Sequence, residues 1–422
     1  MNDVTQPARG RGLMLSVVAT VAALVALLAL APFASATSDP VASGTTSVTL
    51  NKGFFKKLKK AGVKVLKVSP GTVKNRKVTL PVSGGSIDPT NGLGSLELSG
   101  GMKFKRGKKT AAVNTLVLDT AKSSLTAKVA GKSMKLASVA NLTYSRNGFG
   151  VNVNVAQLKL TGKAAKQLNK KLGFTGQKKG KAKGKKRAAA SKVVQPPFKG
   201  NQVLGGSFSE AQPKTVAVVA TGDASLVVSP EALKKLATIG PESPPASGEH
   251  PFAVKLAPVA PTKIVSLSPV TVAFPISGGT MGPTATTGVL QTAGGLRLTQ
   301  NLEGLDGNGE TILTMGNVWV DLGAKTASVE VTIENAKNKE LNKGPLGRAS
   351  IADINLTGAT ITANPATRTV SVQNASASLQ AITAETLNSV FIGPMEKAFG
   401  PQPNKFAAGD PLGTFSFTAQ TQ

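Results

Sequence analysis

Residues 81–85 read Pro-Val-Ser-Gly-Gly, and residues 275–279 read Pro-Ile-Ser-Gly-Gly, 194 positions further along the chain. At the same offset, the Gly-Gly pair at 100–101 matches the pair at 294–295. Glycine and proline each suit a few special backbone conformations, so matches that keep one register over this distance indicate a repeated structural unit. We therefore predict two copies of one domain.

The register extends outward from these motifs with small insertions. The further matches are Lys56-Lys57-Leu58 with Lys234-Lys235-Leu236, Leu118-Asp119 with Val320-Asp321, Leu168-Asn169 with Leu387-Asn388, and Leu204-Gly205 with Leu412-Gly413. Each copy is long enough to close its own core. We assign the first copy to residues 45–209 and the second to residues 222–418. Residues 37–44 and 210–221 are expected to be linkers, and residues 419–422 a short tail.

Within each copy the hydrophobic residues mostly alternate with polar ones. Residues 151–155 read Val-Asn-Val-Asn-Val, and residues 329–333 read Val-Glu-Val-Thr-Ile. A period of two is typical of strands with one buried face, and frequent Gly and Pro residues indicate turns between short strands. The predicted fold is mainly β, with two tandem antiparallel sandwich-like or barrel-like domains and short helices.

Two helical patterns recur in each copy. We predict helices over residues 53–61 and 162–172, matched by residues 230–237 and 384–390 in the second copy. Ser229, Thr161 and Thr383 are the expected N-caps, because a hydroxyl oxygen before a helix can accept hydrogen bonds from its first backbone N–H groups. Helices this short need packing against the rest of the domain to persist.

The N-terminus has the features of an export signal. Arg9 and Arg11 precede an uncharged stretch over residues 13–31, and a small-x-small motif follows at residues 34–36. This order is typical of a secretory signal peptide over residues 1–36, cleaved after Ala36. The alternative is an uncleaved N-terminal membrane anchor, since the stretch is close to spanning length. Both interpretations predict a secreted or envelope-associated protein.

The composition excludes several kinds of chemistry. The chain has no cysteine, so disulfides, thiolate metal sites and cysteine nucleophiles are excluded. His250 is the only histidine and Tyr144 the only tyrosine. A catalytic triad would depend on that one histidine, and no paired carboxylates stand out in the sequence. We predict no catalytic residues, no metal site and no enzymatic activity; an extracellular hydrolase remains the weakest alternative.

The positive charge is concentrated in the first copy. Residues 41–210 contain 34 Lys and Arg against 4 Asp and Glu, whereas residues 211–422 contain 14 against 15. Residues 175–197 are rich in Lys, Gly and Ala, and we predict a mobile loop there. The candidate polyanion-binding residues are Lys56, Lys57, Lys59, Lys60, Lys103, Lys105, Arg106, Lys108, Lys109, Lys178, Lys179, Lys181, Lys183, Lys185, Lys186 and Arg187.

Such a one-sided charge favours binding to negatively charged surfaces. Lysine predominates over arginine, which indicates diffuse attraction more than bidentate recognition. Aromatic residues make up only 4% of the chain, so the stacking platforms used for specific nucleic-acid binding are not expected. For an exported protein, the expected partners are anionic cell-wall polymers or membrane-surface polymers. The predicted function is binding or structural, at the cell envelope.

The repeat resembles a unit found in secreted actinobacterial proteins, and more distantly the HtaA domain of haem-uptake proteins. The resemblance rests on PVSGG-x4-P, LGSLELSGGMKF, LTGKAAKQLNKKLG and a closing F-x5-LG, and covers most of both copies. It implies a β-rich, exported domain that binds haem through a tyrosine near its start and a later histidine. This chain has Leu58 and Leu236 where that tyrosine is expected, and its Gly-Gly turns lack histidine.

Haem binding is therefore the alternative function, and no cofactor is the first expectation. An iron ligand would have to come from the remaining candidates, Tyr144 in an alternating segment and His250 in a loop rich in Pro, Ser and Gly. A surface tyrosine and a solvated loop histidine are the competing interpretation of the same two residues.

Overall fold

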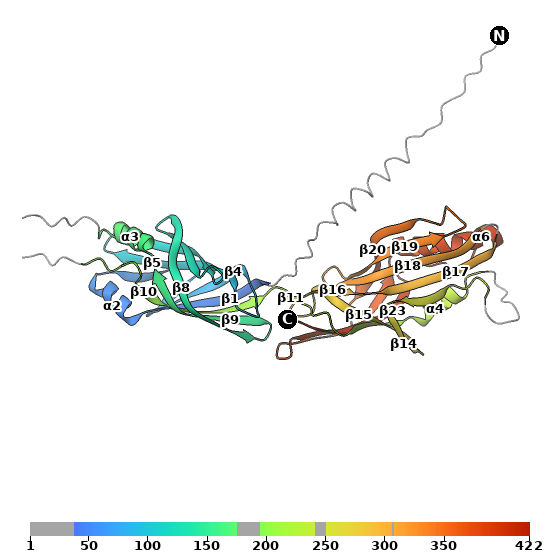
Figure 1. The fold of residues 1–422 in the computed structure, drawn as a ribbon, viewed down its shortest axis with the longest axis horizontal. Helices are drawn as coiled ribbons and strands as arrows, with labels where there is room; N and C mark the ends of the chain where they lie inside the picture. The colour runs from blue at the N-terminus through green and yellow to red at the C-terminus, as the bar shows by residue number, and fades with distance from the viewer. Residues whose placement is uncertain (1–37, 175–194, 241–249, 306–307) are drawn as a thin grey trace, which may run out of the picture.

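A computed structural model describes residues 38–174, 195–240, 250–305 and 308–422. It contains two β domains that follow one another along the long axis of the molecule (Figure 1). The predicted signal peptide, most of the predicted loop at 175–197 and the cationic cluster from Lys178 to Arg187 lie outside the described residues. Within the described ranges, no helix has the length and apolarity needed to cross a membrane.

The first domain is a closed antiparallel sheet of eight strands, in the order β4-β5-β6-β7-β8-β9-β10-β1, with β4 hydrogen-bonded to β5. Two short strands, β2 and β3, extend it. The elements are β1 (Asp39–Leu50), α2 (Lys52–Lys60), β2 (Lys64–Val68), β3 (Thr72–Lys74), β4 (Lys77–Ile87), β5 (Gly94–Arg106), β6 (Lys109–Asp119), β7 (Ser124–Val129), β8 (Lys132–Asn147), β9 (Gly150–Leu160), α3 (Gly162–Lys171) and β10 (Val203–Pro213).

The second domain closes in the same way, because β16 pairs with both β15 and β18. Its elements are β11 (Val216–Ala217), β12 (Asp223–Val228), α4 (Pro230–Ala237), β13 (Lys255–Val259), β14 (Lys263–Leu267), β15 (Val270–Met281), β16 (Gly288–Thr292), β17 (Gly295–Leu305), β18 (Asn308–Asp321), β19 (Thr326–Asn335), β20 (Gly344–Asn355), β21 (Thr360–Asn364), β22 (Thr369–Leu379), α5 (Ala381–Leu387), the π-helical turn η1 (Asn388–Ile392), α6 (Gly393–Phe399) and β23 (Pro411–Gln420).

The two domains repeat individual hydrogen bonds as well as strand order. Asn169 Nδ2 donates to the carbonyl of Phe198 at 2.7 Å, and its counterpart Asn388 donates to the carbonyl of Phe406 at 2.8 Å. In each domain the aspartate at the end of β6 or β18 caps the following turn by accepting backbone N–H bonds. The prediction of two related, mainly β domains is confirmed, and barrel is the better description of each.

The structure corrects three local expectations. Strand β1 begins at Asp39, inside the segment expected to be a linker, because it pairs along β4 and β10. The second expected linker contains the end of β10 and strand β11. Thr383 is not an N-cap, because α5 begins at Ala381, preceded by Gln380 without a side-chain cap bond. Asn51, which was not predicted, caps α2.

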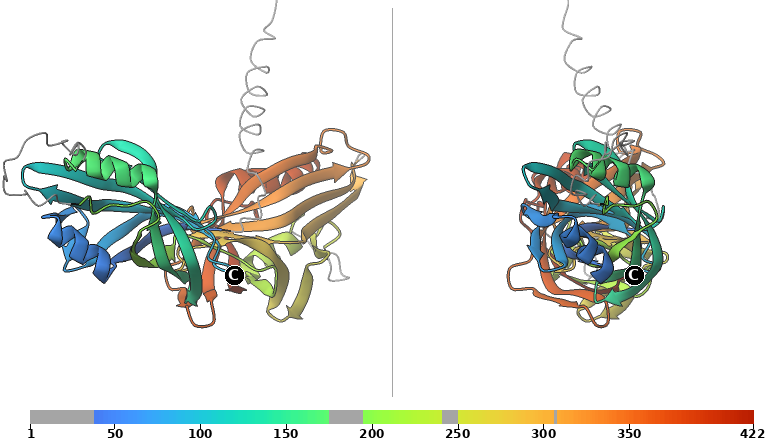
Figure 2. Two further views of the ribbon diagram at one scale, coloured as in Figure 1. Left: turned by 60° about the vertical axis from the view of Figure 1, so that its left-hand side comes forward. Right: turned by 90° about the vertical axis from the view of Figure 1, so that its left-hand side faces the viewer.

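The helices mark the outer end of each barrel. Figures 1 and 2 show α2 and α3 at the end of the first domain that faces away from the second, whereas α4 and α6 lie at the far end of the second. The ends that meet carry strand tips. Phe149, at the β8–β9 turn of the first domain, is buried in the second domain's hydrophobic cluster, so a core contact joins the domains.

Candidate functional site

Helix α2 presents lysines to solvent because its other face is buried. Asn51 Oδ1 accepts hydrogen bonds from the backbone N–H groups of Gly53 at 2.8 Å and Phe54 at 3.2 Å, and so starts the helix. Phe54 and Leu58, four residues apart, point into the core. The predicted lysines of this helix, Lys56, Lys57, Lys59 and Lys60, are therefore exposed. Those in the last turn lie near the negative end of the helix dipole, which is a favourable position for a positive charge.

The second predicted cluster forms the tip of the β5–β6 hairpin. Lys105 and Lys108 are exposed there. Arg106 has a structural role, because its guanidinium donates to the carbonyls of Leu172 and Gly173, both at 3.3 Å, and stacks 4.0 Å from the centre of the Phe174 ring. The hairpin tip is thereby fixed against the end of helix α3, and Arg106 is less free to bind a partner than the lysines around it.

One aromatic cluster holds both groups of lysines at the same end of the domain. Phe198 contacts Phe54 of α2, with ring centres 5.8 Å apart, and Phe104 of β5, with ring centres 5.1 Å apart. Figure 2 shows the helices and the hairpin gathered at this outer end. The tertiary structure thus joins lysines that are some fifty positions apart in the sequence.

We call this surface the basic end. It comprises the exposed lysines of α2 and of the β5–β6 tip, together with further lysines that the sequence analysis did not select. Helix α3 projects lysines at positions i, i+3, i+7 and i+8, a spacing typical of one helix face. Lys64 of β2 lies opposite Lys105 in the β2–β5 ladder. Marking lysines by helical period, rather than by runs, would have found the α3 group. The added residues are Lys64, Lys163, Lys166, Lys170 and Lys171.

Acidic residues gather toward the other end of the first domain. Along the β5–β6 hairpin, Ser95 pairs with Asp119 near one end and Arg106 pairs with Lys109 at the other. Among the described residues of this domain, the only ion pair within 4 Å joins Lys122 to Asp119. The lysines of the basic end therefore have no carboxylate partner in the described part of the chain, and their charge is available to an external anion.

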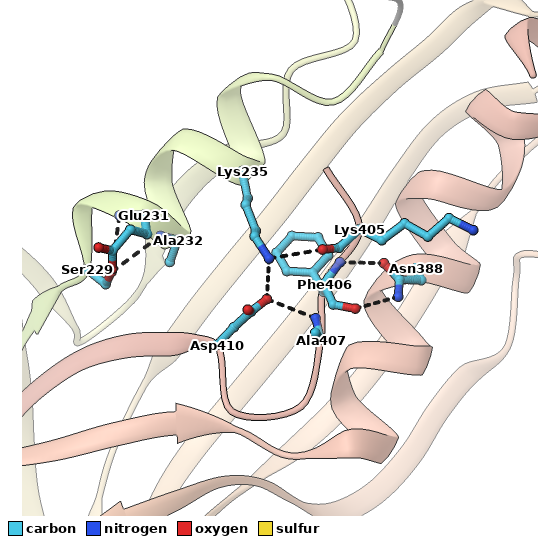
Figure 3. A network of polar contacts seen from close by, with 9 residues as sticks. All are labelled: Ser229, Glu231, Ala232, Lys235, Asn388, Lys405, Phe406, Ala407 and Asp410. Carbon is cyan, nitrogen blue, oxygen red and sulfur yellow. Dashed lines mark hydrogen bonds and ion pairs between the residues drawn. The ribbon is translucent and has the colours of Figure 1, made fainter. Parts of the chain in front are cut away.

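In the second domain, the lysine equivalent to Lys57 is neutralised by a carboxylate. Lys235, the counterpart of Lys57, donates to the carboxylate of Asp410 and to the carbonyl of Lys405 (Figure 3). Burial acts to raise the pKa of Asp410, but hydrogen bonds from Lys235 and the backbone of Ala407 outweigh it, so the pKa lies below its ordinary value. This pair is an intramolecular partner that Lys57 lacks.

The first domain keeps the turn but not the charge. Gln202 stands in the place of Asp410, and its side-chain oxygen accepts the backbone N–H of Lys199 at 3.1 Å. Asp410 accepts the backbone N–H of Ala407 at 2.9 Å in the equivalent turn. The substitution of a neutral acceptor for a carboxylate preserves the loop and leaves Lys57 without a counter-ion.

The haem candidates lie in different domains. The Tyr144 hydroxyl donates to the carbonyl of Thr90, and its ring packs over the turn at Gly92. His250 lies in the second domain, against Gly240, with its ring 6.3 Å from that of Phe252. The structure does not bring the two side chains together, and Leu58 and Leu236, at the positions where the sequence resemblance leads us to expect a tyrosine, are buried. These residues do not fit a two-ligand haem site.

The described ranges contain no group of three or more acidic or histidine side chains able to hold a metal ion. A smaller titratable group lies at the domain junction. Asp39 is 5% exposed, and burial raises its pKa to about 6; Arg146 and the backbone of Ala217 act to lower it, and Asp88 to raise it. Burial, followed by the nearby Arg368, lowers the pKa of Arg146.

Asp39 is expected to make stability depend on pH. The folded state holds its proton up to about pH 6, whereas an unfolded Asp loses it near pH 4. The free energy of unfolding should therefore fall by about 1–2 kcal/mol as pH rises from 4 to 6, allowing for partial solvent screening. Urea unfolding at several pH values should show this slope in the native sequence and lose it in Asp39→Asn. Replacing the exposed Asp223 by Asn should leave the slope intact; an equal slope in Asp39→Asn would contradict the assignment.

The second barrel contains an apolar cavity of about 150 Å³. Every lining residue except Thr383 is aliphatic, aromatic or methionine. An empty cavity of this size costs about 3–4 kcal/mol relative to a packed core. The hollow at the matching place in the first barrel measures about 20 Å³.

Comparison with solved structures finds domains of HtaA from Corynebacterium glutamicum. The C-terminal domain is 12% identical, with 41% of this chain and 98% of that chain covered and a TM-score of 0.29. The N-terminal domain is 12% identical, with 48% and 99% covered and a TM-score of 0.29. No family model and no curated protein matches the chain. The distant resemblance predicted from the repeat motifs is thus also found among solved structures.

Proposed function

We propose that this protein is exported and acts as a non-enzymatic binding protein of the cell envelope, held on anionic polymers by the basic end of its first domain. The signal-like N-terminus supports export, and the charge asymmetry supports the choice of partner. The observation that carries the proposal is the unpaired state of the basic end, where Gln202 replaces the acid that neutralises the equivalent lysine of the second domain.

The chemistry of this surface fits a flexible polyanion. Exposed lysines on α2, the β5–β6 tip and α3 supply many point charges with little fixed geometry, and ammonium groups of this kind attract phosphate or carboxylate chains without demanding one arrangement. Each bound lysine releases counter-ions from the polymer, so affinity should fall steeply with salt. The basic end lies at the end of the long axis that faces away from the second domain, so binding there leaves the second domain accessible.

The test uses the full chain and an anionic wall polysaccharide. A basic-end variant carries Lys56→Gln, Lys60→Gln, Lys105→Gln and Lys108→Gln. A matched variant carries Lys234→Gln, Lys263→Gln, Lys339→Gln and Lys343→Gln, all exposed in the second domain. Both variants lower the formal net charge of +29 by the same four units.

We expect the basic-end variant to bind about tenfold more weakly at about 50 mM salt and to show a shallower salt dependence. The matched variant should bind like the native protein. Fluorescence anisotropy with labelled polysaccharide at about 50 and 200 mM salt measures both quantities. Equal loss in the two variants would show that net charge alone drives binding and would overturn the assignment of the site.

A further inference from the structure

We propose that the second barrel binds a linear hydrocarbon chain in its apolar cavity. This inference goes beyond the polyanion-binding function and does not depend on it. Closed sheets of eight strands have interiors that side chains just fill or that hold one small ligand. The two barrels of this chain show these two outcomes, with interior spaces of about 20 Å³ and about 150 Å³.

At three interior positions the second barrel has alanine where the first barrel has a larger residue. Phe54, on α2 of the first domain, corresponds to Ala232 on α4, since both lie three residues after the helix N-cap. Leu125 pairs with Leu118, and its counterpart Ala327 pairs with Val320 at the same place in the sheet. A third replacement of this kind substitutes Ala377 for Leu158, which pair with the equivalent glycines Gly413 and Gly205.

The three alanines come from three different elements and line one space. Larger residues compensate only in part, because Phe415 takes the place of Ser207 on the last strand, yet the cavity remains. An engineered cavity of about the same volume, lined by Leu, Ile and Phe, stays dry and binds benzene or xenon. An apolar molecule is therefore the kind of ligand that this lining accepts.

A second hollow lies next to this cavity, on the side that faces the surface. It measures about 80 Å³ and lies between α5 and strands β18 to β20, and its outer lining includes Leu346 and Ile382. Leu346 is 49% exposed and Ile382 is 61% exposed. The hollow shares lining residues with the inner cavity, namely Met315, Ile351, Thr383 and Leu387.

The outer lining of the second hollow is also more apolar than the equivalent surface of the first domain. Ile382 on α5 occupies the place of Lys163 on α3, so an exposed lysine is replaced by an exposed aliphatic residue beside this hollow. Two adjacent and mostly apolar spaces suit an elongated chain more than a compact molecule. No charged side chain lines either space, so a carboxylate or hydroxyl head would stay outside, as burying it unpaired is unfavourable.

Methionine methyl groups give a direct test in the full chain. Met315 lines the cavity, whereas Met102 lines the interior of the first barrel. With 13C-methyl methionine and NMR, titration with decanoate and, separately, with decanol should shift the Met315 signal saturably and leave Met102 unchanged. Affinity should fall about fourfold for each methylene removed from the chain. Binding of decanoate alone would identify fatty acids as the source of the chain, and binding of both would identify the hydrocarbon itself.

Cavity-filling variants decide between ligand binding and an unspecific effect. Ala232→Phe restores the side chain that fills the first barrel and should weaken decanol binding at least tenfold. Leu233→Phe is the matched control, because the first domain has Phe55 there and Leu233 does not line the cavity. If Ala232→Phe does not fold, Ala327→Leu fills the same space from β19. A saturable shift that persists in a folded filling variant, or no shift of Met315 in the native protein, would overturn the proposal.

Discussion

Replacing Phe54 with alanine is expected to lower the free energy of unfolding of the first domain by about 3–5 kcal/mol. Phe54 is 2% exposed and is one of the largest fully buried side chains. It joins helix α2 to the barrel through an edge-to-face contact with Phe198. Alanine would remove this contact and leave a void under α2, because neither the helix nor the closed sheet can collapse into it fully.

The measurement is urea unfolding followed by signals from each domain. Trp319 lies in the second domain and reports its transition, while the Met102 methyl signal reports the first. We expect the Met102 transition to move to lower urea and the Trp319 transition to move less. Phe208→Ala is the matched control, because Phe208 is 42% exposed on β10 and its loss should cost little. Equal destabilisation by both substitutions would contradict the packing account.

Gly100→Ala is expected to cost the first domain about 3 kcal/mol or more. Gly100 has a φ of +84°, and a Cβ atom built on it would lie 2.4 Å from the backbone nitrogen of Gly71 and 2.8 Å from the carbonyl of Val68. The substitution therefore combines an unfavourable left-handed backbone with contact against another backbone segment, which has no side chain to move aside. The same pair of constraints holds at Gly294 in the second domain.

Gly107→Ala separates these two contributions. Gly107 also has a positive φ, +55°, but nothing lies within 4 Å of the position of its Cβ. It should cost only about 1 kcal/mol, the backbone contribution alone. Thermal unfolding of both variants gives the comparison. A cost for Gly100→Ala no larger than that for Gly107→Ala would show that the turn at Gly71 moves away freely.

Much of the fold could be predicted from two patterns in the sequence, the alternation of hydrophobic and polar residues and the internal repeat. Alternating residues predicted strands, and matched glycines predicted two equivalent domains. Ser229 and Thr161 were predicted as N-caps and are N-caps, because capping depends on residues within three positions of each other. Thr383 was predicted wrongly, because α5 begins three residues earlier than the helical pattern indicated.

The candidate site was predicted only in part. The lysines of α2 and of the β5–β6 tip stood out as runs, but their assembly into one surface depends on Phe198, which comes from a loop about ninety residues after Phe104. The lysines of α3 were missed because they are spaced along a helix face. Arg106 was predicted to bind a polyanion, and the structure shows that its guanidinium also contacts Leu172 and Phe174 and so fixes the hairpin.

The sequence by itself determined the repeat, the β class, the one-sided charge and the absence of thiol chemistry, because these depend on composition and local period. Only the tertiary structure decided which lysines share a surface, which lysine meets an acid, and whether a barrel is filled or hollow. The physical reason is that neutralisation and packing are properties of neighbours in space. Ala232, Ala327 and Ala377 are unremarkable in the chain, and their combined effect exists only where the closed sheet brings them around one volume.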